Sequence, residues 1–363
     1  MDERLFLDVV SGRKTSLSAK MMRAVLWLVA PAYRGVMAAR NLLFDVGLKR
    51  AHRSDVPVIS VGNITTGGTG KTPVVAWMAN WLQSRGMKVC LVSRGYRELQ
   101  AGGNDELRVL EQLCPGVPHV QNRDRVAAAK EAVERHHADV IVLDDGFQHR
   151  RLHRDVDIVL LDATNPWGYG HLLPRGLMRE PRSSLRRASI VVLTRVDQVD
   201  EQALQKLRNE VRQATNAPVA EVAFRPTQLR SITGATADVK SFANEKLLAF
   251  CGIGNPEGFR RTLRDSGIHV SDDAFVTFAD HHHYTQSELM SLVDRARAEG
   301  VSAMVTTQKD LVKLDPAWTC TLPIWAVIIG AEVVTGLEAL ESVLQEIADP
   351  KNARDPIAND RAS

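Results

Sequence analysis

A glycine-rich loop, set between a short apolar run and a helical stretch, constrains this chain more than any other feature. The stretch GNITTGGTGKTP spans Gly62 to Pro73, and Thr65 stands where the strict phosphate-loop pattern has its first glycine. The preceding VPVISVGN predicts a buried strand, and TPVVAWMANWLQSRG predicts a helix that ends at Gly86. A strand, a glycine loop and a helix are the context that a phosphate loop requires, so the sequence predicts a nucleotide-binding α/β domain.

The second half of this loop carries the groups that bind nucleotide phosphates. Its glycines allow backbone N–H groups to close around phosphate oxygens, and the following helix adds the positive end of its dipole. The lysine is expected to reach the β- and γ-phosphates of ATP, and the hydroxyl of the next threonine is expected to bind Mg²⁺. The predicted nucleotide-binding residues are Gly67, Gly68, Thr69, Gly70, Lys71 and Thr72.

A pair of carboxylates after a second buried strand supplies the partner that such a metal ion needs. In DVIVLDDGFQH, four apolar residues, Val140 to Leu143, precede Asp144 and Asp145. This is the Walker B form, in which an acidic residue at the end of a neighbouring strand binds the Mg²⁺ of the nucleotide. Both aspartates are therefore predicted metal ligands together with Thr72, and the sequence leaves open which of them binds the ion directly.

Strand-like and helix-like segments alternate along the chain, which predicts a P-loop NTPase-type parallel sheet with helices on both faces. The pattern restarts after residue 241 in a smaller α/β domain, and IWAVIIGAEVV at 324–334 is expected to pair with 220–230 as a β-strand hinge. The expected organisation is an N-terminal segment at 1–50, a P-loop domain at 51–225, a hinge at 226–241, a small α/β domain at 242–322, a returning strand and C-terminal helix at 323–350, and a disordered tail at 351–363.

Composition narrows the partners and the compartment. The net charge of +3 over 363 residues is too small to argue for a nucleic-acid partner. The four cysteines are widely separated and form no C-x-x-C pair, which argues against a disulfide framework and a structural zinc site. The chain is therefore expected in a reducing compartment, by default the cytoplasm.

The first 55 residues are basic and unusually apolar, with ten Lys and Arg against five acids. The longest uncharged run, Ala24 to Tyr33, has ten residues, too few for the roughly 20 of a membrane-spanning helix. The segment predicts an amphipathic helix, interrupted at Pro31, suited either to a membrane interface or to packing on its own domain. Charged and apolar residues separate onto two faces: Lys20, Arg23, Arg34 and Asp45 against Val25, Val29, Ala32, Val36 and Leu43.

Arginine is concentrated between residues 149 and 187, which hold eight arginines and four acids. The planar guanidinium recognises phosphate through paired hydrogen bonds, so this stretch is a candidate site for an anionic substrate beside the nucleotide. A solvated basic loop is the alternative interpretation. The Gly, Pro and Trp content of the stretch favours an ordered loop over a linker.

Seven motifs, in order from Gly62 to Asp310, resemble those of the tetraacyldisaccharide 4′-kinases, which phosphorylate the lipid A precursor. They are GNITTGGTGKTP, SRGY, DDGFQHR, LLPRGLMREP, CGIGNPEGF, FADHHHY and TTQKD. The glycine loop alone is weakly specific, whereas the ordered set is highly specific. The resemblance implies transfer of the γ-phosphate of ATP, with Mg²⁺, to the 4′-hydroxyl of a tetraacylated glucosamine disaccharide 1-phosphate. It also implies a basic hydrophobic first helix at the inner leaflet, on the cytoplasmic face of the inner membrane.

The same resemblance implies roles for particular residues. A carboxylate must orient the attacking hydroxyl and accept its proton, and the stretch GGNDEL, which departs from the family pattern on both sides of its acid pair, puts that role on Asp105. Its partner is His281 of FADHHHY, so the P-loop domain and the small domain are expected to close on each other; Lys71 completes the catalytic set. The implied substrate-binding positions are Asn63, Arg94, Arg125, His149, Arg179 and Glu180.

Two alternatives remain at the level of sequence. Three consecutive histidines, His281 to His283, suggest a metal site, but adjacent strand residues point to opposite faces and no suitably spaced Cys or His accompanies them. GGTGKT also resembles the loop of deviant P-loop ATPases and GTPases that drive protein targeting or metal insertion. Those proteins carry a lysine in the first half of the loop, where this chain has Thr65 and Thr66.

Overall fold

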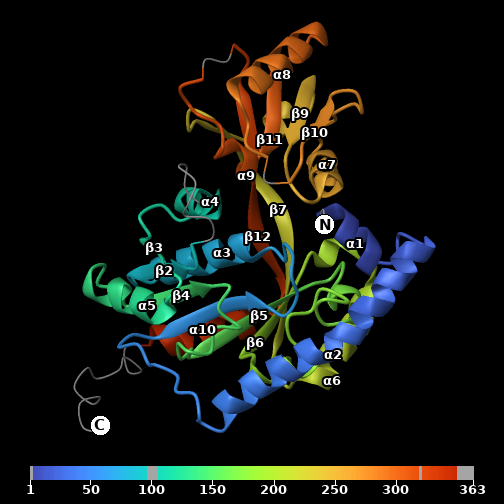
Figure 1. Ribbon diagram of the computed structural model, residues 1–363. Helices are drawn as coiled ribbons and strands as arrows, with labels where there is room; N and C mark the ends of the chain where they lie inside the picture. The colour runs from blue at the N-terminus through green and yellow to red at the C-terminus, as the bar shows by residue number, and fades with distance from the viewer. Residues whose placement is uncertain (1–2, 96–104, 281, 319–320, 350–363) are drawn as a thin grey trace. The chain divides into compact units, whose positions relative to one another are not determined.

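The computed structural model describes residues 3–95, 105–280, 282–318 and 321–349 (Figure 1). The chain divides into two compact units. The first unit comprises residues 1–95, 116–223 and 333–363, and the second comprises residues 96–115 and 224–332. Two long strands, β7 (Val219–Ser231) and β12 (Ile324–Thr335), each contribute residues to both units.

The first unit is a parallel sheet with helices on both faces (Figure 1). Its strand order is β3-β2-β4-β1-β5-β6-β7, and each neighbouring pair is parallel. The predicted α/β class, with its parallel sheet and N-terminal helix, is confirmed. The strands are β1 (Val58–Asn63), β2 (Val89–Ser93), β3 (His119–Gln121), β4 (Val140–Asp144), β5 (Val156–Asp162) and β6 (Ile190–Thr194). The helices are α1 (Glu3–Val10), α2 (Leu17–Asp45), α3 (Lys71–Gln83), α5 (Arg125–Glu134), α6 (Glu201–Ala214) and α10 (Leu337–Ala348), with short 3₁₀ helices η1 (Gly168–Gly170), η2 (Arg182–Arg187) and η3 (Val196–Gln198).

The second unit is a smaller α/β arrangement. Its parallel strands follow the order β10-β9-β11-β12, and β8 pairs with β7 in the antiparallel sense. The strands are β8 (Thr236–Ala237), β9 (Leu247–Cys251), β10 (Phe275–Thr277) and β11 (Ala303–Thr307). The helices are α4 (Asp105–Leu113), α7 (Pro256–Asp265), α8 (Gln286–Ala298), α9 (Gln308–Leu311) and the 3₁₀ helix η4 (Val239–Phe242).

The central strands of the first unit explain where its site lies. β1, β2, β4 and β6 are buried along their whole length, as expected for strands of a parallel sheet covered on both faces. Because the strands are parallel, their carboxyl ends meet at one edge of the sheet. The register pairs Val61 of β1 with Asp144 of β4, so the glycine loop and the acid pair emerge side by side.

The N-terminal helix α2 differs from the prediction at Pro31, where it continues without interruption. Proline removes one N–H donor, and the other hydrogen bonds of the helix maintain its continuity. Ala19 is the buried residue of α2, whereas Val25, Val29 and Val36 are exposed. Among the residues that the structure describes, no helix has the length and apolarity needed to cross a membrane.

The boundaries of the two units differ from the expected organisation in two places. The sequence places residues 96–115 in the P-loop domain, whereas the structure groups α4 with the second unit, where it packs against α9. The returning segment expected at 323–350 is divided, with 324–332 in the second unit and 333–349 in the first. The predicted tail at 351–363 lies outside the described residues.

Candidate functional site

The glycine loop between β1 and α3 has the backbone of a phosphate-binding loop. Gly67 and Gly70 have φ angles of +105° and +80°, in the left-handed region that favours glycine. A Cβ built on Gly67 or Gly68 would meet no atom within 4 Å, so the loop borders open space. Thr69 is held from two sides, because its hydroxyl accepts a hydrogen bond from Asn63 Nδ2 (3.1 Å) and its carbonyl accepts one from Thr194 Oγ1 (2.9 Å).

The first half of the loop is paired with the arginine-rich stretch. Thr66 N donates to the carbonyl of Leu177 at 2.7 Å, and Arg179 N donates to the carbonyl of Ile64 at 2.7 Å. Between them, Thr65 and Met178 form an antiparallel bridge. Thr65 is buried in this pairing, so an extended residue replaces the expected glycine and fixes the arginine-rich stretch to the phosphate loop.

Two cations meet at one carboxylate beside the loop. Asp145 Oδ1 lies 3.4 Å from Lys71 Nζ, and Arg179 Nη1 donates to Asp145 Oδ2 at 2.8 Å. Burial by itself raises the pKa of the Asp145 carboxyl, but the charges of Lys71 and Arg179 outweigh it and hold the pKa below its usual value. Asp145 also has a φ angle of +55°. This left-handed conformation is unfavourable for most residues, but aspartate tolerates it.

Close backbone packing holds the acid pair against the loop. A Cβ on Gly62 would lie 2.6 Å from Phe147 Cβ, and one on Gly146 would lie 2.6 Å from Leu143 Cδ2. Both positions therefore require glycine for steric reasons. This packing brings the DDGF turn directly against the end of β1.

Arg125, a predicted substrate-binding residue, interacts electrostatically with the acid pair and with two other predicted substrate-binding residues, Arg94 and His149. Arg125 is buried at the start of α5 and donates to the carbonyl of Asn122 at 2.9 Å. Burial, and then the charge of Arg94, lowers the pKa of Arg125, while Asp144 and Asp145 act in the opposite direction. Burial, followed by the charge of Arg125, lowers the pKa of His149 to about 4, which leaves a neutral imidazole at pH 7.

Two other predicted substrate-binding residues, Glu180 and Asn63, are buried beneath the site. Glu180 is fully buried, and its Oε2 accepts hydrogen bonds from Asn41 Nδ2 (3.0 Å) and Arg187 Nη2 (2.9 Å). Asn63 is also fully buried, and its amide braces Thr69. Both side chains are buried against neighbouring residues of the protein, and their substrate-binding roles stay predictions.

The sequence profile of the tetraacyldisaccharide-1-P 4′-kinase family, LpxK, matches residues 22–348. The chain belongs to the tetraacyldisaccharide 4′-kinase family. Similar curated proteins with that name come from Anaeromyxobacter sp. strain Fw109-5, 41% identical over 92% of this chain and 94% of that protein, and from Halothermothrix orenii, 34% identical over 86% and 88%. A crystal structure of LpxK from Aquifex aeolicus, described as an "apo" form in complex with ATP, has a TM-score of 0.74 and 30% identity and covers 90% of this chain and 100% of that chain.

The family assignment decides between the two functions that the sequence left open. The resemblance to the tetraacyldisaccharide 4′-kinases is confirmed, because the profile and these relatives extend over most of the chain. The protein-targeting or metal-insertion class has no comparable support. The motifs GNITTGGTGKTP, DDGFQHR and LLPRGLMREP all lie in the first unit.

The predicted Mg²⁺ ligands of the kinase fit that ion chemically. Thr72, Asp144 and Asp145 offer a hydroxyl and two carboxylates, the hard oxygen donors that Mg²⁺ prefers. No group of three or more His, Cys, Asp or Glu side chains suited to a metal occurs in the described part of the chain. Two carboxylates are enough, because Mg²⁺ in kinases completes its coordination with phosphate oxygens and water.

The predicted base, Asp105, belongs to the second unit and begins α4. Its Oδ2 lies 3.8 Å from Lys313 Nζ. Its predicted partner, His281, lies outside the described residues, but the flanking Asp280 and His282 also belong to the second unit. The sequence places Asp105 and His281 in different domains that must close on each other, whereas the structure groups both chain segments in one unit.

Several residues that stabilise the kinase site are not predicted by the sequence. Gln148 Nε2 donates to the carbonyl of Asn63 at 2.8 Å, and Arg179 Nη1 donates to Gln148 Oε1 at 3.4 Å. Tyr33 of α2 donates its hydroxyl hydrogen to the carbonyl of Arg179 at 3.0 Å. Gln148 lies inside the motif DDGFQHR, so the motif indicates it as a site residue. No local sequence pattern connects Tyr33 to Arg179, which is 146 positions away.

The pKa of His149 provides a test of this arrangement. We expect the ring nitrogens of His149, followed by NMR, to titrate near pH 4. Arg125→Gln removes a nearby positive charge and is expected to raise that midpoint by about one pH unit. His119 is the matched control, because burial alone lowers its pKa to about 4 and the substitution is not expected to move it. A wild-type His149 midpoint near 6.5 would contradict the arrangement.

The same shift predicts the sign of a stability effect. The folded state keeps His149 neutral, whereas the unfolded chain binds a proton below the ordinary pKa of 6.5. The contribution of His149 therefore disfavours folding increasingly as the pH falls from 6.5 toward about 4.

Proposed function

We propose that this kinase uses the phosphate loop and the attached arginine-rich stretch to transfer the γ-phosphate of ATP to the 4′-hydroxyl of a tetraacylated glucosamine disaccharide 1-phosphate. One observation carries the proposal: Lys71 of the phosphate loop and Arg179 of the arginine-rich stretch meet at the same carboxylate, Asp145. A nucleotide hydrolase needs the loop and the acid pair. The attached arginine adds a group suited to an anionic acceptor or to the transferred phosphoryl group.

Each part of the loop has a role in that reaction. The N–H groups of residues 67–72 cradle the phosphates, and Lys71 moves from Asp145 to the β- and γ-phosphates when ATP binds. Thr72, Asp144 and Asp145 would hold Mg²⁺, which would neutralise phosphate charge. In this proposal Arg94, Arg125 and neutral His149 bind the headgroup of the acceptor, because Arg125 interacts electrostatically with the acid pair and with the other two residues.

The attacking hydroxyl needs a carboxylate that orients it and accepts its proton. In this proposal Asp105 is that base and His281 is its partner, as the family resemblance implies. Asp105 is half-buried, and the ammonium of Lys313 lies 3.8 Å from its Oδ2.

A direct assay tests the proposed function. The protein is incubated with γ-labelled ATP, Mg²⁺ and the tetraacylated disaccharide 1-phosphate, and the lipids are separated from free phosphate. We expect the label on the disaccharide at its 4′-position. Release of the label only as inorganic phosphate would eliminate the kinase proposal in favour of an ATPase.

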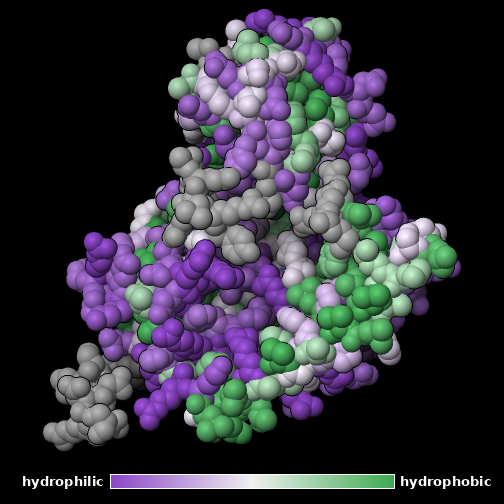
Figure 2. Space-filling model, viewed as in Figure 1, coloured by the Kyte–Doolittle hydropathy of each residue, from purple (hydrophilic) through white to green (hydrophobic). Residues whose placement is uncertain are grey.

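The membrane surface is the proposed location of this reaction, on the cytoplasmic face of the inner membrane. Hydrophobic side chains gather along α2 (Figure 2), and an exposed apolar helix face of this kind suits the membrane interface. The opposite face of α2 reaches the site, since Tyr33 binds the carbonyl of Arg179 and Arg40 donates to the carbonyl of Gln148. The exposed apolar residues of α2 are Leu17, Met21, Met22, Val25, Trp27, Leu28, Val29, Val36 and Leu42.

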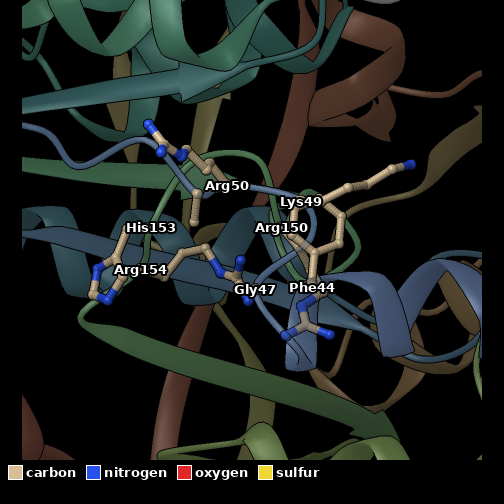
Figure 3. A pocket seen from close by; sticks show the side chains of 8 residues that line it. Phe44, Gly47, Lys49, Arg50, Arg150, His153 and Arg154 are labelled. Carbon is tan, nitrogen blue, oxygen red and sulfur yellow. The ribbon is translucent and has the colours of Figure 1, made fainter.

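Basic side chains at the end of α2 favour an anionic membrane. Lys49 and Arg50, which are exposed, line a pocket with Arg150 and Arg154 (Figure 3). Arg150 and Arg154 are engaged with carboxylates, at 2.7 Å from Asp45 and 2.9 Å from Asp157. Lys49 and Arg50 are therefore the cations best placed to attract anionic headgroups, each by about 1 kcal/mol.

Substitution of the exposed face of α2 tests the membrane proposal. Leu28 and Val36 are 69% and 67% exposed. The double variant Leu28→Glu/Val36→Glu is expected to bind phosphatidylethanolamine–phosphatidylglycerol vesicles about 100-fold more weakly, because each lost apolar contact contributes roughly 1.5 kcal/mol. Leu337→Glu, an exposed apolar position at the start of α10, is the matched control. Unchanged vesicle co-sedimentation of the double variant would assign membrane binding to another surface.

A further inference from the structure

A buried carboxylate in the second unit connects three of the chain's motifs. Asp310 of TTQKD is fully buried. Its Oδ2 accepts hydrogen bonds from Gly252 N (3.0 Å) and from Thr307 Oγ1 (2.7 Å), and its Oδ1 lies 3.1 Å from Lys313 Nζ. The carboxylate thus joins the loop after β9, the turn before α9 and the lysine after α9.

The loop after β9 in turn supports the histidine motif FADHHHY. A Cβ on Gly252 would lie 3.0 Å from His282 Cβ and 3.1 Å from the Tyr284 hydroxyl, and one on Gly254 would lie 3.0 Å from Asp280 Oδ2. These approaches are tighter than most Cβ contacts, so glycine at both positions lets the loop lie close to the histidine motif. Asp310 anchors the loop on which the histidine motif packs.

Lys313 brings the predicted base into the same cluster. Its side chain is 2% exposed, and its ammonium lies 3.8 Å from Asp105 Oδ2 as well as 3.1 Å from Asp310 Oδ1. Hydrogen bonds fix α4 on α9, because Arg108 Nη1 donates to the carbonyl of Val312 at 2.7 Å and Gln308 Nε2 donates to Gln112 Oε1 at 3.0 Å. The position of Asp105 is thereby fixed relative to the buried ammonium.

We propose that Lys313, held in place by Asp310, is a positioning residue for the Asp105 carboxylate. The inference rests on the proposed function, in which Asp105 is the base. A buried ammonium stabilises the ionised form of a nearby carboxylate and restricts its orientation. The closer contact with Asp310 keeps Lys313 in place when Asp105 takes up a proton from the acceptor hydroxyl.

The charged residues of α9 and its following turn are Lys309, Asp310 and Lys313, and of these Asp310 and Lys313 join the cluster with Asp105. Glu106 and Arg108 are the nearest charged residues on α4 itself, and Arg108 is bound to the backbone at Val312.

The first test is the pH profile of kcat for Lys313→Met. Loss of the positive charge is expected to shift the acidic limb upward by about one pH unit, because the carboxylate then holds its proton more tightly. Looser positioning is expected to lower kcat by about 10- to 100-fold at neutral pH, with KM for ATP unchanged. Lys313→Arg keeps the charge and is expected to retain the wild-type limb. A folded Lys313→Met protein with the wild-type profile would overturn the proposal.

A double-mutant cycle distinguishes positioning from a general structural role. If Lys313 acts through Asp105, adding Lys313→Met to Asp105→Asn causes no further loss of kcat. A multiplicative loss would assign Lys313 to some other task and overturn the proposal. Near-normal turnover of Asp105→Asn alone is a different result, because it removes the base assignment of the proposed function.

Folding is controlled separately. Lys313→Met leaves Asp310 as a buried unpaired charge, which is strongly destabilising. The double variant Lys313→Met/Asp310→Asn removes both charges and is expected to unfold at a higher temperature than Lys313→Met. It is still expected to show the shifted acidic limb, since Asp105 lacks its ammonium in both proteins; a wild-type limb in this variant also counts against the proposal.

Discussion

Replacement of Asp105 by alanine is expected to lower kcat by about 10²- to 10⁴-fold, the range that general-base catalysis contributes. The acceptor hydroxyl loses the carboxylate that orients it and takes its proton. KM for ATP is expected to stay within a few fold of the wild-type value, because the phosphate loop supplies the nucleotide contacts and Asp105 belongs to the other unit. The measurement is the initial rate of lipid phosphorylation at saturating acceptor, with ATP varied.

The neighbouring acid is the matched control for this prediction. Glu106 follows Asp105 in the first turn of α4, is exposed, and matches it in charge. Glu106→Gln is expected to retain nearly full turnover, whereas Asp105→Asn loses it despite keeping its size. If the two results are reversed, the base is Glu106 and the placement within GGNDEL is off by one residue.

Local sequence patterns predicted the elements that form the phosphate loop. The run VPVISVGN is β1, the glycine loop follows it, and the helix begins at Lys71. These features depend on interactions between near neighbours: glycine at positive φ, apolar runs in buried strands and a helix start after the loop. For the same reason Asp144 and Asp145 were found at the end of a strand, and the parallel register then brought them to the loop.

Local sequence patterns do not predict the pairing of segments that are far apart in the chain. Thr65 departs from the strict glycine pattern, and its partner, Met178, is 113 residues away in a stretch with no strand pattern. The same pairing buries Glu180 and places Arg179 at Asp145. A sequence motif gives the residue types at a site, but exposure decides which of them can touch a substrate and which support it.

The grouping of α4 with the second unit is a similar case. GGNDEL follows SRGY closely in the chain, which suggests a common domain, yet side-chain contacts join α4 to α9 about 200 residues later. Lys313 belongs to none of the seven motifs, and its only sequence relation to them is that it lies three residues after Asp310. A single lysine at that distance becomes informative only after the fold buries it.

Replacement of Lys71 by alanine is expected to reduce lipid phosphorylation by at least about 10³-fold, because electrostatic stabilisation of the transferred phosphoryl group is the largest contribution to this type of catalysis. In this structure Lys71 Nζ lies 3.4 Å from Asp145 Oδ1, and Arg179 also binds Asp145. In the proposed function ATP would replace this carboxylate with phosphates at Lys71, while the Arg179–Asp145 contact would remain. The alanine variant loses this exchange and leaves the Asp145–Arg179 pair intact.

Two control variants accompany this prediction: one keeps the positive charge at residue 71, and the other removes a lysine elsewhere. Lys71→Arg keeps the positive charge, but a planar guanidinium cannot occupy the position of a compact ammonium in the loop, so we expect most activity to be lost as well. Lys130→Ala removes an exposed lysine on α5 that pairs with Glu134, and it is expected to retain wild-type turnover. The assay is label transfer from ATP to the disaccharide, with nucleotide binding measured in parallel. Activity of Lys71→Ala within a few fold of wild type would mean that the phosphoryl group is stabilised without this lysine, and Arg179 would then be the cation to test first.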